Sequence, residues 1–218
     1  MNLKTTFGFA LRLDRYWALL ILLSGCALTT DQVTLNYKSP GVAAKIDGAG
    51  EVKVFVDMFD VRGMKDRVGV KKNAYGMEMA PIISETSVPL LVTTAIESEL
   101  VLRGFSIGEG AVRLFVELQK FYNDFKSGFW SGTAAAELLM NAQVKAPSGE
   151  ILYSKLIVGN GNLPGIQLAS GENAKIALED ALTDSMGKLF ADRALFDMIF
   201  KASKSQPGAV SLESIAIK

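Results

Sequence analysis

Histidine is absent from this 218-residue sequence, and cysteine occurs once, at Cys26. Without an imidazole the chain cannot build a Ser-His-Asp triad, a Cys-His pair or a histidine-ligated zinc centre. An enzyme would have to use carboxylate, lysine or tyrosine chemistry. The best-spaced carboxylates, Asp57 and Asp60, stand three residues apart in a predicted strand and therefore point to opposite faces. We expect a protein that is not an enzyme and that uses no metal or other cofactor.

The sequence also lacks an excess of basic residues, because 23 Lys and Arg balance 23 Asp and Glu. Proteins that bind nucleic acid depend on cations that contact the phosphate backbone. We therefore expect no nucleic-acid partner.

The apolar run near the N-terminus is too short to span a membrane. Residues 16–23 form this run, whereas a transmembrane helix needs roughly 20 apolar residues. Lys4, Arg12 and Arg15 precede it, and small residues follow it. A basic leader, a short apolar core and a small-residue exit are typical of a secretory signal peptide. We assign residues 1–25 to that signal.

The apolar run closes in Leu23-Ser24-Gly25-Cys26, which resembles a bacterial lipobox. In a lipobox the cysteine sulfur receives a diacylglyceryl group and the chain is cut before the cysteine. Two or more acyl chains hold a protein stably to a bilayer, so we expect Cys26 to anchor the chain to a membrane. The alternative is a free thiol buried at the start of a helix. Ala27 follows the cysteine where inner-membrane lipoproteins often carry Asp, which favours an outer-membrane, periplasm-facing location.

Three further segments follow from composition and periodicity. Residues 26–50 contain Pro and Gly and are typical of a tether, with a possible edge strand at 33–37. Residues 51–202 form the folded body, and residues 203–218 form a C-terminal tail.

Within the body, apolar residues alternate with polar ones in four segments, which predicts strands near 52–58, 112–118, 134–144 and 151–158. Helical spacing predicts one helix from Ser87 to Gly104 and a second from Ser170 to about residue 200. Residues 60–86 and 159–165 are expected to be connections. The fold class is then α+β: a two-layer sandwich in the order β-α-β-β-β-α, with two helices packed on one face of a mainly antiparallel sheet.

The first candidate site follows the first strand of the body. Asp60 and Arg62 lie on the same side of the strand end, and Lys71, Lys72 and Tyr75 follow in a glycine-containing loop. This loop could bind an anionic group or a partner. The alternative is a solvated loop in which the Asp60–Arg62 pair fixes the exit angle of the chain.

The second candidate site is aromatic. Tyr122, Phe125, Phe129 and Trp130 fall around the Lys126-Ser127-Gly128 turn. Amphipathic aromatic rings at a hairpin end could contact a partner protein, a glycan or a membrane interface. The alternative is a small satellite core beneath the hairpin.

Three short motifs resemble the YajG family of bacterial lipoproteins. They are a strand ending in Asp60-Val61-Arg62, the loop from Gly69 to Gly76 with its Lys-Lys-Asn and Tyr, and a helix ending in Arg103-Gly104-Phe105. The resemblance implies fold and location but carries no biochemical activity. We expect a lipid-anchored accessory protein that binds or assembles an envelope protein. The alternative is a module that binds lipid, glycan or peptidoglycan.

Overall fold

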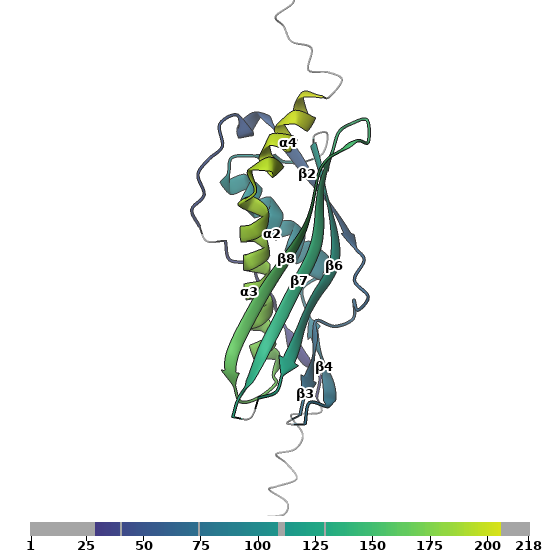
Figure 1. Ribbon diagram of the computed structural model, residues 1–218, viewed down its shortest axis with the longest axis vertical. Helices are drawn as coiled ribbons and strands as arrows, with labels where there is room; N and C mark the ends of the chain where they lie inside the picture. The colour runs from purple at the N-terminus through teal and green to yellow at the C-terminus, as the bar shows by residue number, and fades with distance from the viewer. Residues whose placement is uncertain (1–28, 40, 74, 109–111, 129, 206–218) are drawn as a thin grey trace, which may run out of the picture.

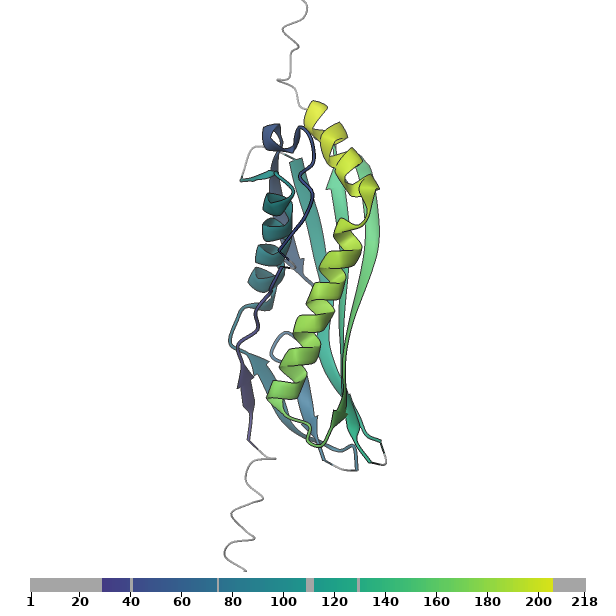
Figure 2. The ribbon, with the colours of Figure 1, turned by 90° about the vertical axis from the view of Figure 1, so that its left-hand side faces the viewer.

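Helices cover one face of a single sheet in this computed structural model, which describes residues 29–205 except 40, 74, 109–111 and 129 (Figures 1 and 2). The predicted signal peptide, Cys26, Phe129 and most of the predicted tail lie outside the described residues. The α+β class and the two-layer arrangement are confirmed.

The sheet has eight strands. They are β1 (Asp31–Val33), β2 (Lys53–Asp60), β3 (Gly69–Lys72), β4 (Glu78–Ser84), β5 (Ser106–Ile107), β6 (Val112–Lys126), β7 (Gly132–Lys145) and β8 (Ile151–Ile166). Strands β6, β7 and β8 form an antiparallel meander that supplies most of the paired residues. On its other edge, β6 pairs in parallel with β2 along its first half and with β3 near its end. Strand β4 pairs antiparallel with β3 and in parallel with β1, and β5 pairs in parallel with β2.

Three α-helices and one short 3-10 helix complete the described part of the chain. They are η2 (Ala49–Glu51), α2 (Val88–Leu102), α3 (Gly171–Phe190) and α4 (Arg193–Lys204). Helix α2 lies between β4 and β5 in the chain, and so belongs to the long connection from β2 to β6. Such a crossover connection allows β2 and β6 to run in parallel. None of the helices in this part of the chain is long and apolar enough to cross a membrane.

The core lies between the helices and the sheet. Alternate residues of β6 and β7, such as Leu114, Leu118, Leu138 and Met140, are fully buried beneath the helices. Helix α3 packs closely on β8 because Gly161 has no side chain there. A Cβ atom on this glycine would lie 1.9 Å from the carbonyl oxygen of Ala177.

The predicted order of elements was incomplete. The expected connection 60–86 contains the β3–β4 hairpin, whose strands are short and interrupted by glycines and Pro81. Strand β8 continues to Ile166 through the expected connection at 159–165. The second helix ends at Phe190, and Asp192 starts α4 by accepting a hydrogen bond from the Ala194 N–H.

The segment expected to be a tether is bound to the body from β1 onward. The strand lies at Asp31–Val33 rather than at 33–37, and residues 34–39 and 41–48 then run along the helix layer (Figure 2). The Asn36 N–H donates to Glu179 Oε1 of α3 at 2.9 Å, and the Ile46 N–H donates to the Arg103 carbonyl at 2.9 Å. Leu35 is fully buried in the core.

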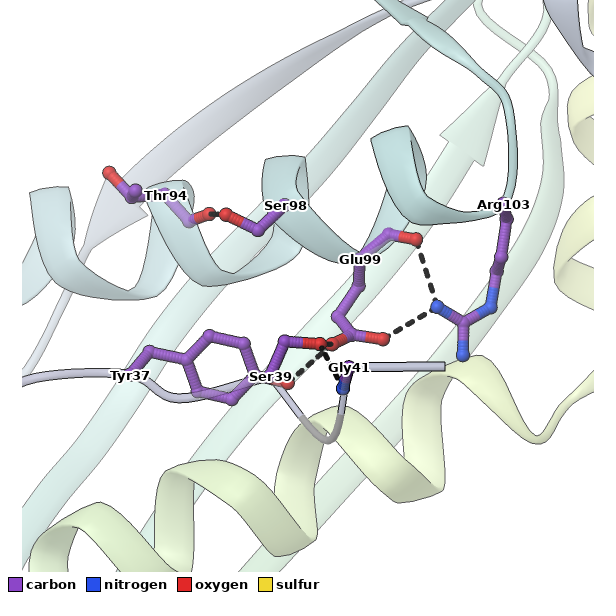
Figure 3. A network of polar contacts seen from close by, with 7 residues as sticks. All are labelled: Tyr37, Ser39, Gly41, Thr94, Ser98, Glu99 and Arg103. Atoms are coloured by element: carbon purple, nitrogen blue, oxygen red, sulfur yellow. Dashed lines mark hydrogen bonds and ion pairs between the residues drawn. The ribbon is translucent and has the colours of Figure 1, made fainter. Parts of the chain in front are cut away.

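Glu99 of α2 holds this segment in place (Figure 3). Its side chain is only 3% exposed, and its Oε1 accepts hydrogen bonds from the hydroxyls of Tyr37 at 2.6 Å and Ser39 at 2.5 Å. Its Oε2 accepts from Arg103 at 2.6 Å. Burial alone would raise the pKa of Glu99, but these donors outweigh it and lower that pKa. Burial and the adjacent carboxylate raise the pKa of Tyr37.

Candidate functional site

Three turns meet at one end of the molecule, the lower end in Figure 1. They are the β3–β4 turn, the β6–β7 turn and the connection from β8 to α3. Together they surround a hollow of about 320 Å³, lined by residues from all three that include Lys72, Phe125, Trp130 and Leu168.

Large apolar side chains are exposed on each of these turns. Tyr75 is 88% exposed, Met77 57%, Trp130 86% and Leu168 64%. We call these four residues the tip surface. Isolated exposed apolar residues are common on proteins, but a group of them on adjacent turns marks an interaction surface.

The charges around the tip surface are nearly balanced. Lys72 forms an ion pair with Asp124 of β6, and the exposed Lys126 and Glu78 carry opposite charges. This surface therefore presents apolar groups for contact and has no excess of positive or negative charge.

Lys71, which the sequence placed in the same candidate loop, does not reach the tip surface. It is buried and its Nζ donates to Asp31 Oδ1 at 2.9 Å. The other carboxylate oxygen of Asp31 accepts the backbone N–H of Gly171 at the start of α3, at 2.7 Å. Asp31 thus joins β1, β3 and α3 close to the first described residues.

The predicted aromatic group is divided between surface and core. Trp130 belongs to the tip surface, whereas Phe125 is buried at the base of the hollow. Tyr122 is half-buried on the face of the sheet without helices, and burial together with the charge of Glu78 raises its pKa. Phe129 lies outside the described residues.

Asp60 and Arg62 lie apart from the tip surface, beside the first turn of α2. The Arg62 Nε and Nη2 atoms donate to the two Asp60 carboxylate oxygens, both at 2.9 Å, and the Arg62 backbone N–H donates to Asp60 Oδ1. The bonds from Arg62 lower the pKa of Asp60. Arg62 is buried, so the pair has the geometry of the alternative interpretation, a bridge that fixes the path of the chain.

A second apolar surface was not anticipated from the sequence. The sheet face without helices, which we call the outer face, carries Phe55, Phe59 and Phe115. The rings of Phe59 and Phe115 stack with centroids 6.4 Å apart, and Arg113 and Lys145 lie over aromatic rings at 5.5 and 4.3 Å. The signal in the sequence was that apolar residues occupy both faces of β2 rather than one.

Within the described part of the chain, no group of His, Cys, Asp and Glu side chains is arranged so that it could hold a metal ion. Four carboxyls there, Asp60, Glu99, Asp184 and Asp192, have a lowered pKa because of hydrogen bonds from Arg, Lys, hydroxyl or backbone groups, against the opposing effect of burial.

Three solved structures are similar to this chain, and the first of the three shares its fold. A Xanthomonas campestris protein of the DUF330 family has a TM-score of 0.53 at 13% identity, covering 79% of this chain and 99% of that one. A neuraminyllactose-binding hemagglutinin homolog from Helicobacter pylori has a TM-score of 0.45 at 10% identity, covering 78% and 100%. A minor lipoprotein from Acinetobacter baumannii has a TM-score of 0.39 at 9% identity, covering 65% and 92%. No curated protein matches the sequence.

The fold defines a class, a two-layer α+β protein, and its described part exposes apolar side chains at the tip surface and on the outer face. The family follows from the sequence itself. The model of a family described as uncharacterized lipoprotein matches residues 42–199, and this chain belongs to that family. The expected membership of an uncharacterised lipoprotein family is confirmed.

Proposed function

We propose that the chain is an envelope lipoprotein, anchored by acyl chains on Cys26 and facing the periplasm, that binds another envelope protein without catalysing a reaction. Family membership supports the anchor. The outer face is the observation that carries the binding role, because none of the described helices covers it and its aromatic side chains are exposed or half-buried.

The outer face has the composition of a protein interface. Phe59 is 49% exposed beside the ring of Phe115, and Leu156 and Val158 of β8 are also exposed. Aromatic residues and arginine are enriched where proteins bind one another, and Arg113 stands beside these rings. We expect the partner to present an apolar patch to these rings.

The anchor is tested by labelling cells with a palmitate analogue. Wild-type protein is expected to carry the label and to sediment with membranes, and Cys26→Ser to do neither. A Cys26→Ser protein that still sediments with membranes would contradict the anchor.

The binding role is tested by placing a photo-crosslinking amino acid at Phe59 in living cells. A discrete adduct with one envelope protein is expected from this position. The matched control is Asp180, an exposed residue of α3 on the helix side, which should give no such adduct. Identical adduct patterns from the two positions, or none from Phe59, would argue against the outer face as an interface.

A further inference from the structure

Chain length limits how far Cys26, the proposed anchor, can lie from the end of the body that carries the tip surface. Asp31 is five residues after Cys26, and a chain spans at most about 3.6 Å per residue, so Cys26 lies within about 18 Å of Asp31. This limit decides which parts of the body can touch the bilayer.

The strand register shows how far along the molecule Cys26 can lie, given this maximum distance from Asp31. Asp31 pairs with Ile82 of β4, and Ile82 stands four residues after Glu78, where β4 leaves the β3–β4 turn, a distance of about 13 Å along the strand. An anchor within about 18 Å of Asp31 can therefore reach the level of the tip surface.

The opposite end is out of reach. Gly69 pairs with both Ile82 and Asn123, so Asn123 of β6 lies at the level of Asp31. Strand β6 begins eleven residues earlier, at Val112, about 36 Å away. Residues 34–39 and 41–48 do not act as a free tether, because Glu179, Glu99 and Arg103 bind them at Asn36, Tyr37 and Ile46.

We infer that the tip surface rests on the bilayer that holds Cys26, with Tyr75, Met77, Trp130 and Leu168 at the lipid interface. Tryptophan and tyrosine are the side chains that favour this interface, since each has an apolar ring and a polar group. The nearly balanced charge around the turns means that contact does not depend on anionic lipids. The inference rests on the proposed lipid anchor.

The chain supplies its own probe for this contact. It has two tryptophans, Trp17 and Trp130, and Trp17 is removed with the predicted signal peptide. The tryptophan fluorescence of the mature lipoprotein therefore comes from Trp130 alone.

The experiment uses the full acylated protein in phosphatidylcholine vesicles, with and without bromine atoms on the lipid acyl chains. Bromine quenches tryptophan at short range, and an interfacial side chain lies at the boundary of the acyl region, so Trp130 should lose roughly half of its emission. The matched control carries Trp130→Phe with Ile151→Trp, which moves the indole to an exposed residue at the opposite end. Its emission should not change.

Other outcomes overturn the inference in distinguishable ways. Vesicle-bound protein with unquenched Trp130 removes the tip contact and leaves the anchor intact. Quenching in both proteins means that the molecule lies flat on the bilayer, which also contradicts the inference. Protein that does not associate with vesicles at all rejects the lipid anchor, and the inference with it.

Discussion

Glu99 determines how the N-terminal segment meets the body. Its carboxylate receives three side-chain donors, from Tyr37, Ser39 and Arg103, two of which come from sixty or more residues away in the chain. Because of these bonds, the chain is fixed to the body from β1 onward instead of hanging free up to residue 50. The proposed anchor, Cys26, therefore precedes the first strand residue, Asp31, by only five positions.

Replacing Glu99 should weaken its bonds to the N-terminal segment and to Arg103. We expect Glu99→Gln to lower the free energy of unfolding by about 2–3 kcal/mol, because the neutral amide cannot satisfy Arg103 and two hydroxyls equally well. Urea denaturation measures the loss. Glu97→Gln on the same helix is the control, since burial raises the pKa of Glu97 and removing its charge should cost little. Equal losses in the two variants would contradict the role of Glu99.

The lowered pKa of Glu99 also predicts a dependence on pH. A carboxyl with a depressed pKa in the folded state contributes stability above its ordinary value of 4.5, and that contribution is lost as the pH falls below it. Between neutral pH and pH 4, wild type should therefore lose more stability than Glu99→Gln. Parallel loss in urea titrations of the two proteins would show that Glu99 is not responsible.

At the scale of elements, the contact between α3 and β8 depends on glycine. Gly161→Ala should lower the free energy of unfolding by about 3 kcal/mol, because the added Cβ would force α3 away from the strand. Gly187→Ala in the same helix has open space and should raise stability by about 1 kcal/mol. Chemical denaturation of both variants tests the pair. If Gly161→Ala leaves the free energy of unfolding unchanged, then α3 packs on β8 less closely than the structure shows.

The free edge of β8 is protected by α3. Asp184 accepts the backbone N–H of Asn160, and Lys188 donates to the carbonyl of Val158, which occupies backbone groups that another strand could otherwise pair with. Asp184→Ala with Lys188→Ala leaves the net charge unchanged and should increase self-association in sedimentation velocity. Asp180→Ala, an exposed position on the same helix, should not.

Elements in which apolar residues recur at a regular spacing over many residues could be predicted from the sequence. Elements that depend on contacts with residues far away in the chain could not. Strand β7, helix α2 and the first half of β6 follow from alternation and helical spacing alone. Strand β6 was expected to end near residue 118, but it continues to Lys126 past a register shift between Leu118 and Lys120. Strand β8 was expected to stop at residue 158 because glycine and asparagine are typical of loops, yet those glycines admit α3. The break after α3 depends on Asp192, which also binds Tyr153 and Lys155 of β8.

The same limit applies to the candidate site. Trp130 and Tyr75 were identified because aromatic residues beside turn signals stand out in a sequence. Lys71 looked equally suitable, but its partner Asp31 is forty residues away and no local pattern indicates that pair. Leu168 was not singled out, because only the fold brings the β8–α3 connection next to the other two turns.

At the scale of the whole molecule, the bound N-terminal segment should resist proteolysis. Trypsin should cut slowly after Lys38, because the neighbouring Tyr37 and Ser39 are held by Glu99. The Glu99→Gln variant should be cut there much faster. Cleavage after the exposed Lys126 in the β6–β7 turn provides an internal reference for both proteins. Equally rapid cleavage after Lys38 in wild type would show that the segment is a free tether.

Strand β6 runs nearly the length of the body, and its fifteen residues extend about 50 Å. With the tip surface on lipid, this strand makes the protein a spacer of fixed height. A partner bound beside Arg113 and Lys145, at the far end of the outer face, would stand several nanometres above the headgroups, and the number of residues in one strand would set that elevation.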